Sequence, residues 1–507
     1  MTRLLSPEIV RELSLRIDAG SLSEDDRALI KAVMVQHLAI GQALQDRTTT
    51  IAKLMRMLFG QRTEKARKVM PDPALRPKHA PPTSRGHGRN GAPAYARAAK
   101  IVAPHVLHSG DACPGCEKGK LYPSTPGVTI RITGTAPLAA CLWEQEKLRC
   151  NCCGELFAAT LPDGVGVEKH DASAGAMIAL LKYGTGVPLN RLEALQESLG
   201  IPLPASTQWD VIEKTAGRIY PAYQELIRNA AQGELLHNDD TTMKLLAAAG
   251  DGERSGTFTT GVLSVTDEQK IALFFTGHKH AGENMADLLK KRHPDRGPPL
   301  QMCDALSRNE PKDVAVILAN CLAHARRNFV DQAENFPDDC RHVIEALGEV
   351  YGNDAATKAL KPPDRLAYHQ THSGPVMENL RAWMTAQFDA KTAEPNSGLG
   401  KAFTYMLKHW EALTLFLRVE GAPLDNNACE RALKMAIRHR RNSLFYKTLH
   451  GAYIGDLFMS IIHTCRLSKV NPLDYLVALQ KHHKALRAHP DRWMPWNYTR
   501  AATVPAS

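Results

Sequence analysis

The sequence predicts a multidomain α/β protein whose α/β core is interrupted by a helical insertion. The chain has 507 residues, which at about 100–200 residues per domain corresponds to roughly three or four units. Long stretches repeat apolar residues at helical spacing, whereas residues 233–304 show the short apolar runs and alternations of strands. Helical spacing resumes from residue 311, so the strand-rich part is expected to be a single core with helices inserted into it.

The composition is that of a globular protein, with 44% hydrophobic and 23% charged residues. It excludes wholesale disorder, a collagen-like chain and a small disulfide scaffold. No apolar run approaches the ~20 residues that span a bilayer, and the start lacks the apolar core of a signal peptide. We therefore expect a cytoplasmic protein with no membrane partner, in which the 11 cysteines are metal ligands, buried thiols or reactive thiols.

Residues 1–60 are predicted to form an N-terminal helical segment. Between residues 33 and 58, apolar residues follow a 3–4 spacing that is broken at His37 and Arg47, which permits a short coiled coil. An amphipathic helix packed on its own chain fits the same spacing.

Most of the net charge of +10 lies in one basic segment. Residues 61–100 hold ten Lys or Arg, six prolines and only two acids, so they cannot form a long helix or strand. We predict an extended linker over residues 61–104. It is either a solvated tether or a segment that follows a phosphate backbone.

Two Cys-x-x-Cys pairs predict a zinc ribbon over residues 105–164. Cys113 and Cys116 form the first pair, and Cys150 and Cys153 form the second. Four such thiolates can close a tetrahedral site for one structural Zn²⁺. Strand alternation at residues 128–132 fits a β-rich ribbon. Buried, unligated cysteines are the alternative, and Cys152 could replace Cys150 or Cys153.

Residues 165–232 are predicted to be helical, with a break near residues 184–188 and a second helix from Ser206. Such a module binds DNA in a helix-turn-helix manner or links the ribbon to the core.

Residues 233–310 predict the first part of a nuclease-like core. Strands are expected at 234–246, 257–265, 271–276 and 300–304, with a helix at 283–291 before the last strand. This β-β-β-α-β order is expected of a ribonuclease H-like core. In such a core the first and fourth strands are neighbours, so Asp239 and Asp304 would face each other across a gap.

The next segment, residues 311–420, is predicted to be an inserted helical subdomain with helices at 314–329, 340–350 and 377–388. It is too long to be a loop. It contains Cys321-Leu-Ala-His324, which could form a second metal pair, although a Cys and a His packed on one helix is the simpler interpretation.

Residues 421–480 are predicted to complete the core, and residues 481–507 form a C-terminal tail. Asn427 and Glu430 have the spacing of a capping box, so a helix is expected to begin there. Lys434 and Arg438 would lie one and two turns further along the face of Glu430. Residues 431–450 contain six Lys or Arg and no acid, which suits the approach of a phosphodiester.

The three acids fit one chemistry. Two divalent ions about 3.5–4 Å apart can activate an attacking oxygen and stabilise a leaving one. Hard Mg²⁺ or Mn²⁺ ions prefer oxygen ligands, which Asp239, Asp304 and Glu430 would supply. Taken singly, each acid also fits a turn, a strand end or a helix cap.

Several sequence blocks between residues 55 and 479 together suggest a known family. They are Leu58-Phe-Gly-Gln-Arg-Thr-Glu-Lys65, the two Cys-x-x-Cys pairs, Leu236-His-Asn-Asp239-Asp-Thr241, Leu300-Gln-Met-Cys-Asp304, Cys321-Leu-Ala-His-Ala-Arg-Arg327, Pro423-Leu-Asp-Asn-Asn-Ala-Cys-Glu430-Arg and Arg441-Asn-Ser-Leu-Phe445. By these blocks the chain resembles the TnpC-type DDE transposases of the insertion-sequence-66 group. The chain departs from the family at Asp240, Ala305-Leu306 and Leu322, where the family usually has Glu, Gly-Tyr and an aromatic residue.

The resemblance implies a DNA transposase that cuts element ends and joins them to target DNA. The metal-binding triad is then Asp239, or its neighbour Asp240, with Asp304 and Glu430, holding two Mg²⁺ or Mn²⁺ ions. A homo-oligomer is expected because two ends must be joined, and helper proteins of the same element are further partners. The alternative is a non-catalytic zinc-ribbon DNA-binding protein on a decayed nuclease-like core. Candidates for contacts with DNA phosphates are Lys434, Arg438, Arg440 and Arg441.

Overall fold

The computed structural model describes residues 168–246, 256–266 and 268–503 without a gap. Of the first 167 residues it describes shorter pieces, chiefly 15–17, 23–27, 106–124, 135–149 and 155–163. The chain divides into two compact units, Met1–Asp72 and Pro73–Ser507. Residues 24–27 are helical, as predicted. The predicted coiled coil and nearly all of the basic linker lie outside the described residues.

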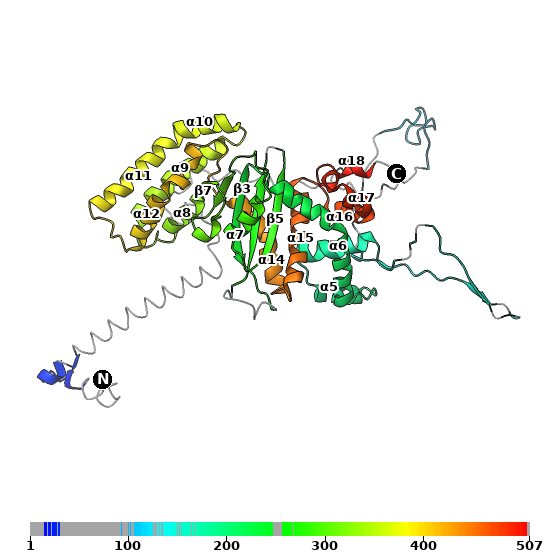
Figure 1. Cartoon of the computed structure of the whole chain (residues 1–507), viewed down its shortest axis with the longest axis horizontal. Helices are drawn as coiled ribbons and strands as arrows, with labels where there is room; N and C mark the ends of the chain where they lie inside the picture. Colours follow the sequence, from blue (N-terminus) through cyan, green and yellow to red (C-terminus); the bar gives the residue numbers. More distant parts are fainter. Residues whose placement is uncertain are drawn as a thin grey trace. The chain divides into compact units, whose positions relative to one another are not determined.

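A five-stranded mixed sheet forms the centre of the larger unit (Figure 1). Its strand order is β5-β4-β3-β6-β7. The first three strands in sequence pair antiparallel, whereas β6 and β7 run parallel to β3. The predicted first and fourth strands, β3 and β6, are therefore neighbours. The strands are β3 (Leu235–Thr242), β4 (Phe258–Val265), β5 (Lys270–Gly277), β6 (Leu300–Cys303) and β7 (Ile317–Asn320).

The fifth strand corrects the sequence prediction. A helix was expected over residues 314–329, but β7 occupies its first part and α8 (Leu322–Val330) begins only after Cys321. A short apolar run such as residues 314–318 fits a buried helix and a buried strand equally well. The parallel partner β6, which pairs with β7 along its whole length, decides between them.

Helices cover both faces of the sheet. Asp240 in β3 bonds to the first turn of α7 (Ala281–Leu289), whereas its neighbour Thr241 bonds to Arg440 in α14 (Asn427–Ser443). Because successive side chains of a strand point to opposite faces, α7 and α14 lie on opposite sides of β3.

Helix α15 (Leu449–Leu467) closes the open edge of the sheet at β5. Three of its polar side chains accept the outward N–H groups of alternate β5 residues. Thr464 accepts from Ala272 at 3.1 Å, Ser460 from Phe274 at 2.9 Å, and Asp456 from Thr276 at 2.6 Å. The match is geometric, because four helical residues and two strand residues both advance by about 6–7 Å. An unpaired edge would otherwise attract another strand.

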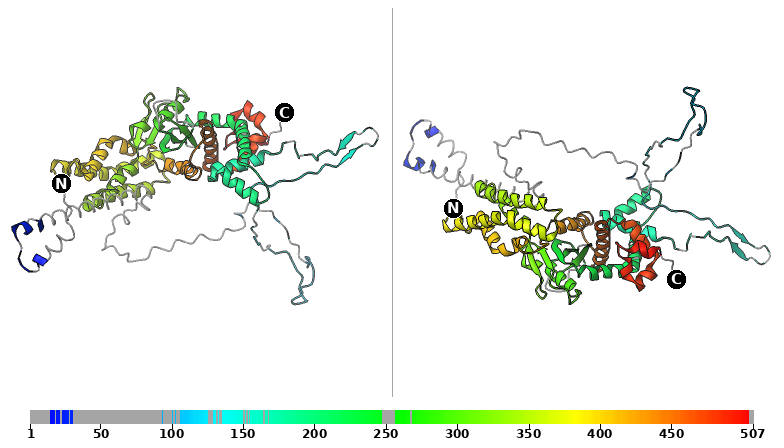
Figure 2. Two further views of the ribbon diagram at one scale, coloured as in Figure 1. Left: turned by 90° about the horizontal axis from the view of Figure 1, so that it is seen from below. Right: turned by 90° about the horizontal axis from the view of Figure 1, so that it is seen from above.

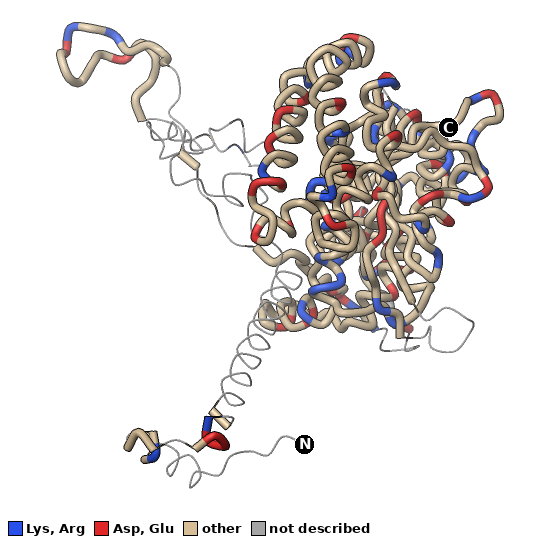
Figure 3. The backbone as a smooth tube through the Cα atoms, turned by 90° about the vertical axis from the view of Figure 1, so that its left-hand side faces the viewer, with Lys and Arg blue, Asp and Glu red and all other residues tan. Residues whose placement is uncertain are grey.

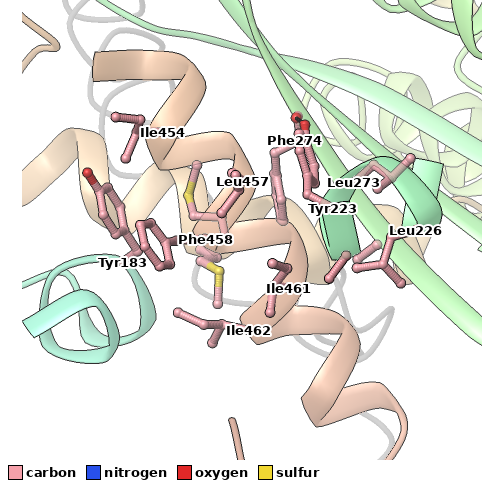
Figure 4. Packing of buried hydrophobic residues seen from close by; sticks show 14 of the residues in the cluster. Tyr183, Tyr223, Leu226, Leu273, Phe274, Ile454, Leu457, Phe458, Ile461 and Ile462 are labelled. Carbon is pink, nitrogen blue, oxygen red and sulfur yellow. Dashed lines mark hydrogen bonds between the residues drawn. The ribbon is translucent and has the colours of Figure 1, made fainter. Parts of the chain in front are cut away.

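The main buried cluster surrounds α15. Phe458 stacks on Tyr183 at a centroid distance of 5.3 Å, while Leu457 and Ile461 lie toward Phe274 of the sheet (Figure 4). A helix with apolar residues around most of its circumference is buried, and most of α15 is covered by the sheet and by the helices around it.

The helices predicted before the core are confirmed, and they share this buried cluster with the sheet. The break predicted at 184–188 is present, because the first helix ends in a π-helical turn, η2, and the next begins at Leu189. These elements are α4 (Ala172–Ala179), η2 (Leu180–Gly184), α5 (Leu189–Ser198) and α6 (Ala205–Ala230).

The helices of the insertion lie at the β7 edge, opposite the edge that α15 covers (Figures 1 and 2). The helices predicted at 340–350 and 377–388 are confirmed within α9 and α11. The elements are α9 (Pro337–Ala356), α10 (Pro362–His372), α11 (Gly374–Asp389), α12 (Gly398–Lys408) and α13 (Trp410–Leu413).

The chain ends in short helices, α16 (Pro472–Lys481), α17 (His483–Ala488) and α18 (Tyr498–Ala502). The stretch expected as a C-terminal tail buries Trp493 and Met494 in the main cluster. No helix in the described parts of the chain is both long and apolar enough to span a membrane.

The cysteine-rich region contains two hairpins. Ala112 and Lys120 form an antiparallel bridge around Cys113 and Cys116, and β1 (Lys147–Arg149) pairs with β2 (Leu156–Ala158) on either side of the second cysteine pair. Of the strand predicted at 128–132, Ile130 and Ile132 lie in no strand and are exposed, while residues 128 and 131 lie outside the described residues.

Candidate active site on strands β3 and β6

The pairing of β3 with β6 brings two of the predicted acids together. His237 pairs with Met302 in the parallel register, and continuing this register by two residues places Asp304 beside Asp239. Adjacent strands are about 4.8 Å apart, and residues two apart on a strand share a face. Both carboxylates therefore start from the sheet face that carries α14.

The third acid, Glu430, lies in the first turn of α14. The predicted capping box is wrong: the residue before the helix is Asn426, whose side chain makes no cap bond. Asp425 instead accepts from the backbone N–H of Asn427 at 3.1 Å and from its side-chain amide at 2.6 Å. Sequence spacing identified the start of the helix to within one residue but not the bonds made there.

Asn426 joins three distant segments and so fixes the start of α14. Its Oδ1 lies 3.0 Å from Nδ1 of His237, and its Nδ2 donates to the Asn238 carbonyl at 3.0 Å. Its backbone N–H donates to the Cys321 sulfur at 3.2 Å. All four residues are buried. The position of Glu430 relative to Asp239 thus depends on a residue that sequence reasoning missed, although two adjacent asparagines before a helix were a visible signal.

The electrostatics of Asp239 show that the three acids interact. Burial, the largest cause, and the negative charges of Asp304, Glu430 and Asp240 together raise its pKa to about 7, against a lowering by the Asp240 backbone N–H. Like charges that converge on a poorly solvated carboxylate disfavour its ionised form. Perturbed acids of this kind are characteristic of functional sites.

Asp240 points to the opposite face and is fully engaged there. It accepts from the Thr260 hydroxyl at 2.6 Å and from the Ala281 N–H at 3.0 Å, and it lies 3.2 Å from Nδ1 of His280. Its side chain is 3% exposed. Asp240 therefore holds the N-terminus of α7, and of the two neighbours it is Asp239 that faces Asp304.

Asp304 is held by a buried amide network. Asn309 donates to its carboxylate. The Asn309 carbonyl in turn accepts from Asn238 and from Gln301, both at 2.8 Å. These bonds fix the turn after β6, where Ala305 and Leu306 stand.

His324 is a further neighbour that sequence reasoning did not place. Its Nε2 lies 3.8 Å from Oε1 of Glu430. For Cys321 the simpler interpretation, a thiol packed beside the start of the helix, fits the structure: its sulfur is buried and accepts from the Asn426 N–H at 3.2 Å.

The basic residues of α14 divide into two groups. Lys434, Arg438 and Arg441 are exposed, and within the described chain none of them forms an ion pair. Arg440 donates to the hydroxyls of Thr241 at 3.0 Å and Thr242 at 2.6 Å, so its guanidinium braces the end of β3.

The donor sets suit the expected metals to different degrees. Three carboxylates are the hard oxygen ligands that Mg²⁺ or Mn²⁺ prefers. Among the described residues, however, no three His, Cys, Asp or Glu side chains lie close enough together to enclose an ion.

The first cysteine pair is better organised. The N–H groups of Lys118 and Gly119, together with Cys113, lower the pKa of the Cys116 thiol, which favours a thiolate ligand. Of the second pair, Cys150 and the alternate Cys152 lie outside the described residues, and Cys153 is exposed.

Comparison with known proteins identifies the family. The model of the family described as Transposase IS66 family matches residues 170–454, more than half of the chain. Two similar proteins of Sinorhizobium fredii (strain NBRC 101917 / NGR234) are named Uncharacterized protein y4hP and Uncharacterized protein y4jD. The first is 28% identical over 358 residues, 65% of this chain and 62% of the relative; the second is 32% identical over 174 residues, 34% of each. The matches thus span less than two thirds of the relatives' length. On the strength of the family match, the chain belongs to the IS66 family of transposases.

Proposed function

We propose that the protein is a DDE transposase that cuts DNA strands at the ends of an insertion sequence and transfers them to target DNA. The carrying observation is the electrostatic coupling of Asp239 to Asp304 and Glu430, which come from β3, β6 and α14. The strand order β5-β4-β3-β6-β7 supports a ribonuclease H-like core. Membership of the IS66 family supports DNA as the partner.

Asp239, Asp304 and Glu430 would hold two Mg²⁺ or Mn²⁺ ions, which supply activation of the attacking oxygen and stabilisation of the leaving one. The residues themselves have distinct duties. Asp239 must lose its proton to act as a ligand, so ion binding and deprotonation are linked. Asp240 positions α7 and takes no part in the chemistry. Lys434, Arg438 and Arg441 receive DNA phosphates, and Arg440 braces the end of β3.

The zinc ribbon remains part of the proposal. Cys113, Cys116, Cys150 and Cys153 would hold one structural Zn²⁺, supported by the lowered pKa of Cys116 and by the β1–β2 hairpin beside the second pair. Its task would be to hold element ends in a cytoplasmic homo-oligomer, together with helper proteins of the element. Zinc content unchanged in a Cys113→Ser, Cys116→Ser double variant would remove this assignment.

A metal-dependent nicking assay on DNA carrying the element's ends tests the proposed chemistry. The Asp304→Asn variant should bind these ends but not cut them in Mg²⁺. Asp313→Asn is the matched control, since Asp313 is exposed and only nine residues away. Equal cutting by wild type and Asp304→Asn would refute the triad. Binding without cutting by the wild type would favour the rival function, a non-catalytic DNA-binding protein. The observations that favour this rival are the departures from the family pattern at Asp240 and Ala305.

A further inference from the structure

Two arginines from different helices meet at the turn that follows η2. Arg466 of α15 donates from Nη2 to the Gly184 carbonyl at 2.9 Å. The side chain of Arg438 lies along Gly186, where an added Cβ would stand 3.1 Å from its Cγ. Gly186 has φ +83°, and its carbonyl accepts from Asn442 at 3.0 Å. The turn therefore contacts both helices: the Arg466 guanidinium is bonded to Gly184, and the aliphatic part of the Arg438 side chain packs on Gly186.

The surface around this turn carries positive charge without a balancing acid. Burial and the nearby charge of Arg438 lower the pKa of Arg466, which shows that the two guanidinium groups repel each other. Neither group forms an ion pair with a carboxylate of the described chain. Elsewhere basic and acidic residues are interspersed (Figure 3). A pair of like charges held together by packing is stabilised by an anion placed between them.

The surface continues the basic face of α14 that starts at Glu430. Lys434 lies one turn and Arg438 two turns beyond Glu430, and both are exposed. Eight helical residues advance about 12 Å, which equals the rise of roughly three or four nucleotides of one DNA strand. A strand cut beside Glu430 can therefore reach Arg438 and Arg466 without bending sharply.

We propose that Arg438 and Arg466, together with the turn at Gly184 and Gly186, form a phosphate-binding site that holds the DNA backbone a few nucleotides from the cleavage point. This inference rests on the proposed function and adds Arg466 to the DNA contacts. A guanidinium pair suits a phosphodiester because its planar N–H groups match two phosphate oxygens at once.

The salt dependence of DNA binding tests this site. The full chain is titrated with a 30-base-pair duplex of mixed sequence at several KCl concentrations. Each phosphate contact contributes about 0.9 to the slope of log affinity against log salt, or about a 3- to 4-fold loss of affinity between 50 and 200 mM. We expect Arg438→Gln and Arg466→Gln each to lower the slope by about one contact.

Two further variants separate binding from folding. Arg466→Lys keeps the charge but not the guanidinium, so it should retain most of the slope. Arg487→Gln, an exposed change on α17, should leave the slope unchanged. If both Arg466 variants lower the melting temperature but keep the wild-type slope, Arg466 is only a structural tether and the inference is wrong.

The outcomes stay distinct from those of the proposed function. Cutting by Asp304→Asn would refute the triad and leave the phosphate site intact. If Asp304→Asn does not cut, while Arg438→Gln and Arg466→Gln keep the wild-type salt slope, the triad is supported and the phosphate site is refuted. A wild-type chain that does not bind the duplex would overturn both.

Discussion

The adjacent residues Asp239 and Asp240 of β3 have different roles, because successive side chains of a strand point to opposite faces. Asp240 is buried and satisfied by Thr260 and the N-terminus of α7. Asp239 is half-buried and lies near other acids, and its partial burial together with their charges raises its pKa to about 7. Asp240 thus stabilises the fold. The ionised form of Asp239 is destabilised by its surroundings, and a bound cation or a proton would remove that cost.

Asp239→Asn should abolish cutting yet make the folded protein more stable at pH 8 in the absence of divalent ions. The folded-state pKa of about 7 lies above the ordinary 3.8, so the carboxylate costs stability as pH rises through this range. Removing it should gain on the order of 1–3 kcal/mol, since one pKa unit is about 1.4 kcal/mol. Thermal unfolding at pH 8 and the nicking assay measure the two effects.

Asp240→Asn is the contrasting change. It weakens the acceptor at the start of α7, which should cost about 1 kcal/mol, and it should leave measurable cutting. If instead Asp240→Asn were inactive and Asp239→Asn active, the assignment of the two neighbours would be reversed.

At the scale of elements, α15 serves as both core and sheet edge. Its apolar side chains fill the main cluster, while Asp456, Ser460 and Thr464 bond to the edge of β5. The polar groups do not weaken the core because each one satisfies a backbone group that would otherwise be buried unpaired.

Asp456→Asn should change the pH dependence of stability. Burial raises the pKa of Asp456 to about 7, against a lowering by its bonds to Thr276. An acid with a raised pKa takes up a proton on folding, so its contribution to stability declines as pH rises from about 4 to 7. The asparagine resembles the neutral acid. Variant and wild type should therefore melt alike at pH 5, and the variant should melt higher at pH 8.5.

Ser460→Ala is the control for this comparison. It removes the bond to the Phe274 N–H and should destabilise by about 1–3 kcal/mol at every pH, because Ser460 does not titrate. A parallel pH profile for Asp456→Asn and wild type would contradict a neutral Asp456.

At the scale of the molecule, the candidate site is assembled by long-range contacts. Asn426, Cys321 and Asn238 meet although they are separated by 105 and 188 residues from Asn426 along the chain. The insertion that lies between β7 and α14 in sequence stays at the β7 edge. It therefore leaves β3, β6 and α14 free to adjoin one another.

Asn426→Ala should destabilise the folded protein and displace Glu430 from the candidate site. His237 and the Asn238 carbonyl would lose buried partners, at about 1–3 kcal/mol each, and Glu430 would lose its fixed position. We expect a lower melting temperature and slower cutting with unchanged affinity for DNA. Asn427→Ala, at a half-exposed neighbour, should have little effect on either. Equal cutting by the wild type and both variants would show that Asn426 does not position Glu430.

Much of this architecture could be predicted because local pattern and final structure agree. The alternation in 257–265, the apolar run in 271–276 and the helical spacing in 340–350 each describe an element that the structure contains. The prediction was wrong where a partner decides the outcome. Residues 317–320 form a strand because they pair with β6 along their whole length, whereas the described residues of the alternation at 128–132, Ile130 and Ile132 among them, lie in no strand.

The sequence by itself determined which acids stand at the ends of which strands, and hence the neighbouring positions of Asp239 and Asp304. It left open whether Asp239 or Asp240 faces the site, because two adjacent acids have the same pattern. Only the tertiary structure decided this, through the helix that takes up Asp240. The tertiary structure alone also places Arg438 near Arg466 and Asn426 in hydrogen-bond contact with His237. Local pattern follows from backbone geometry, whereas electrostatic and hydrogen-bonding partners are chosen only when distant segments pack together.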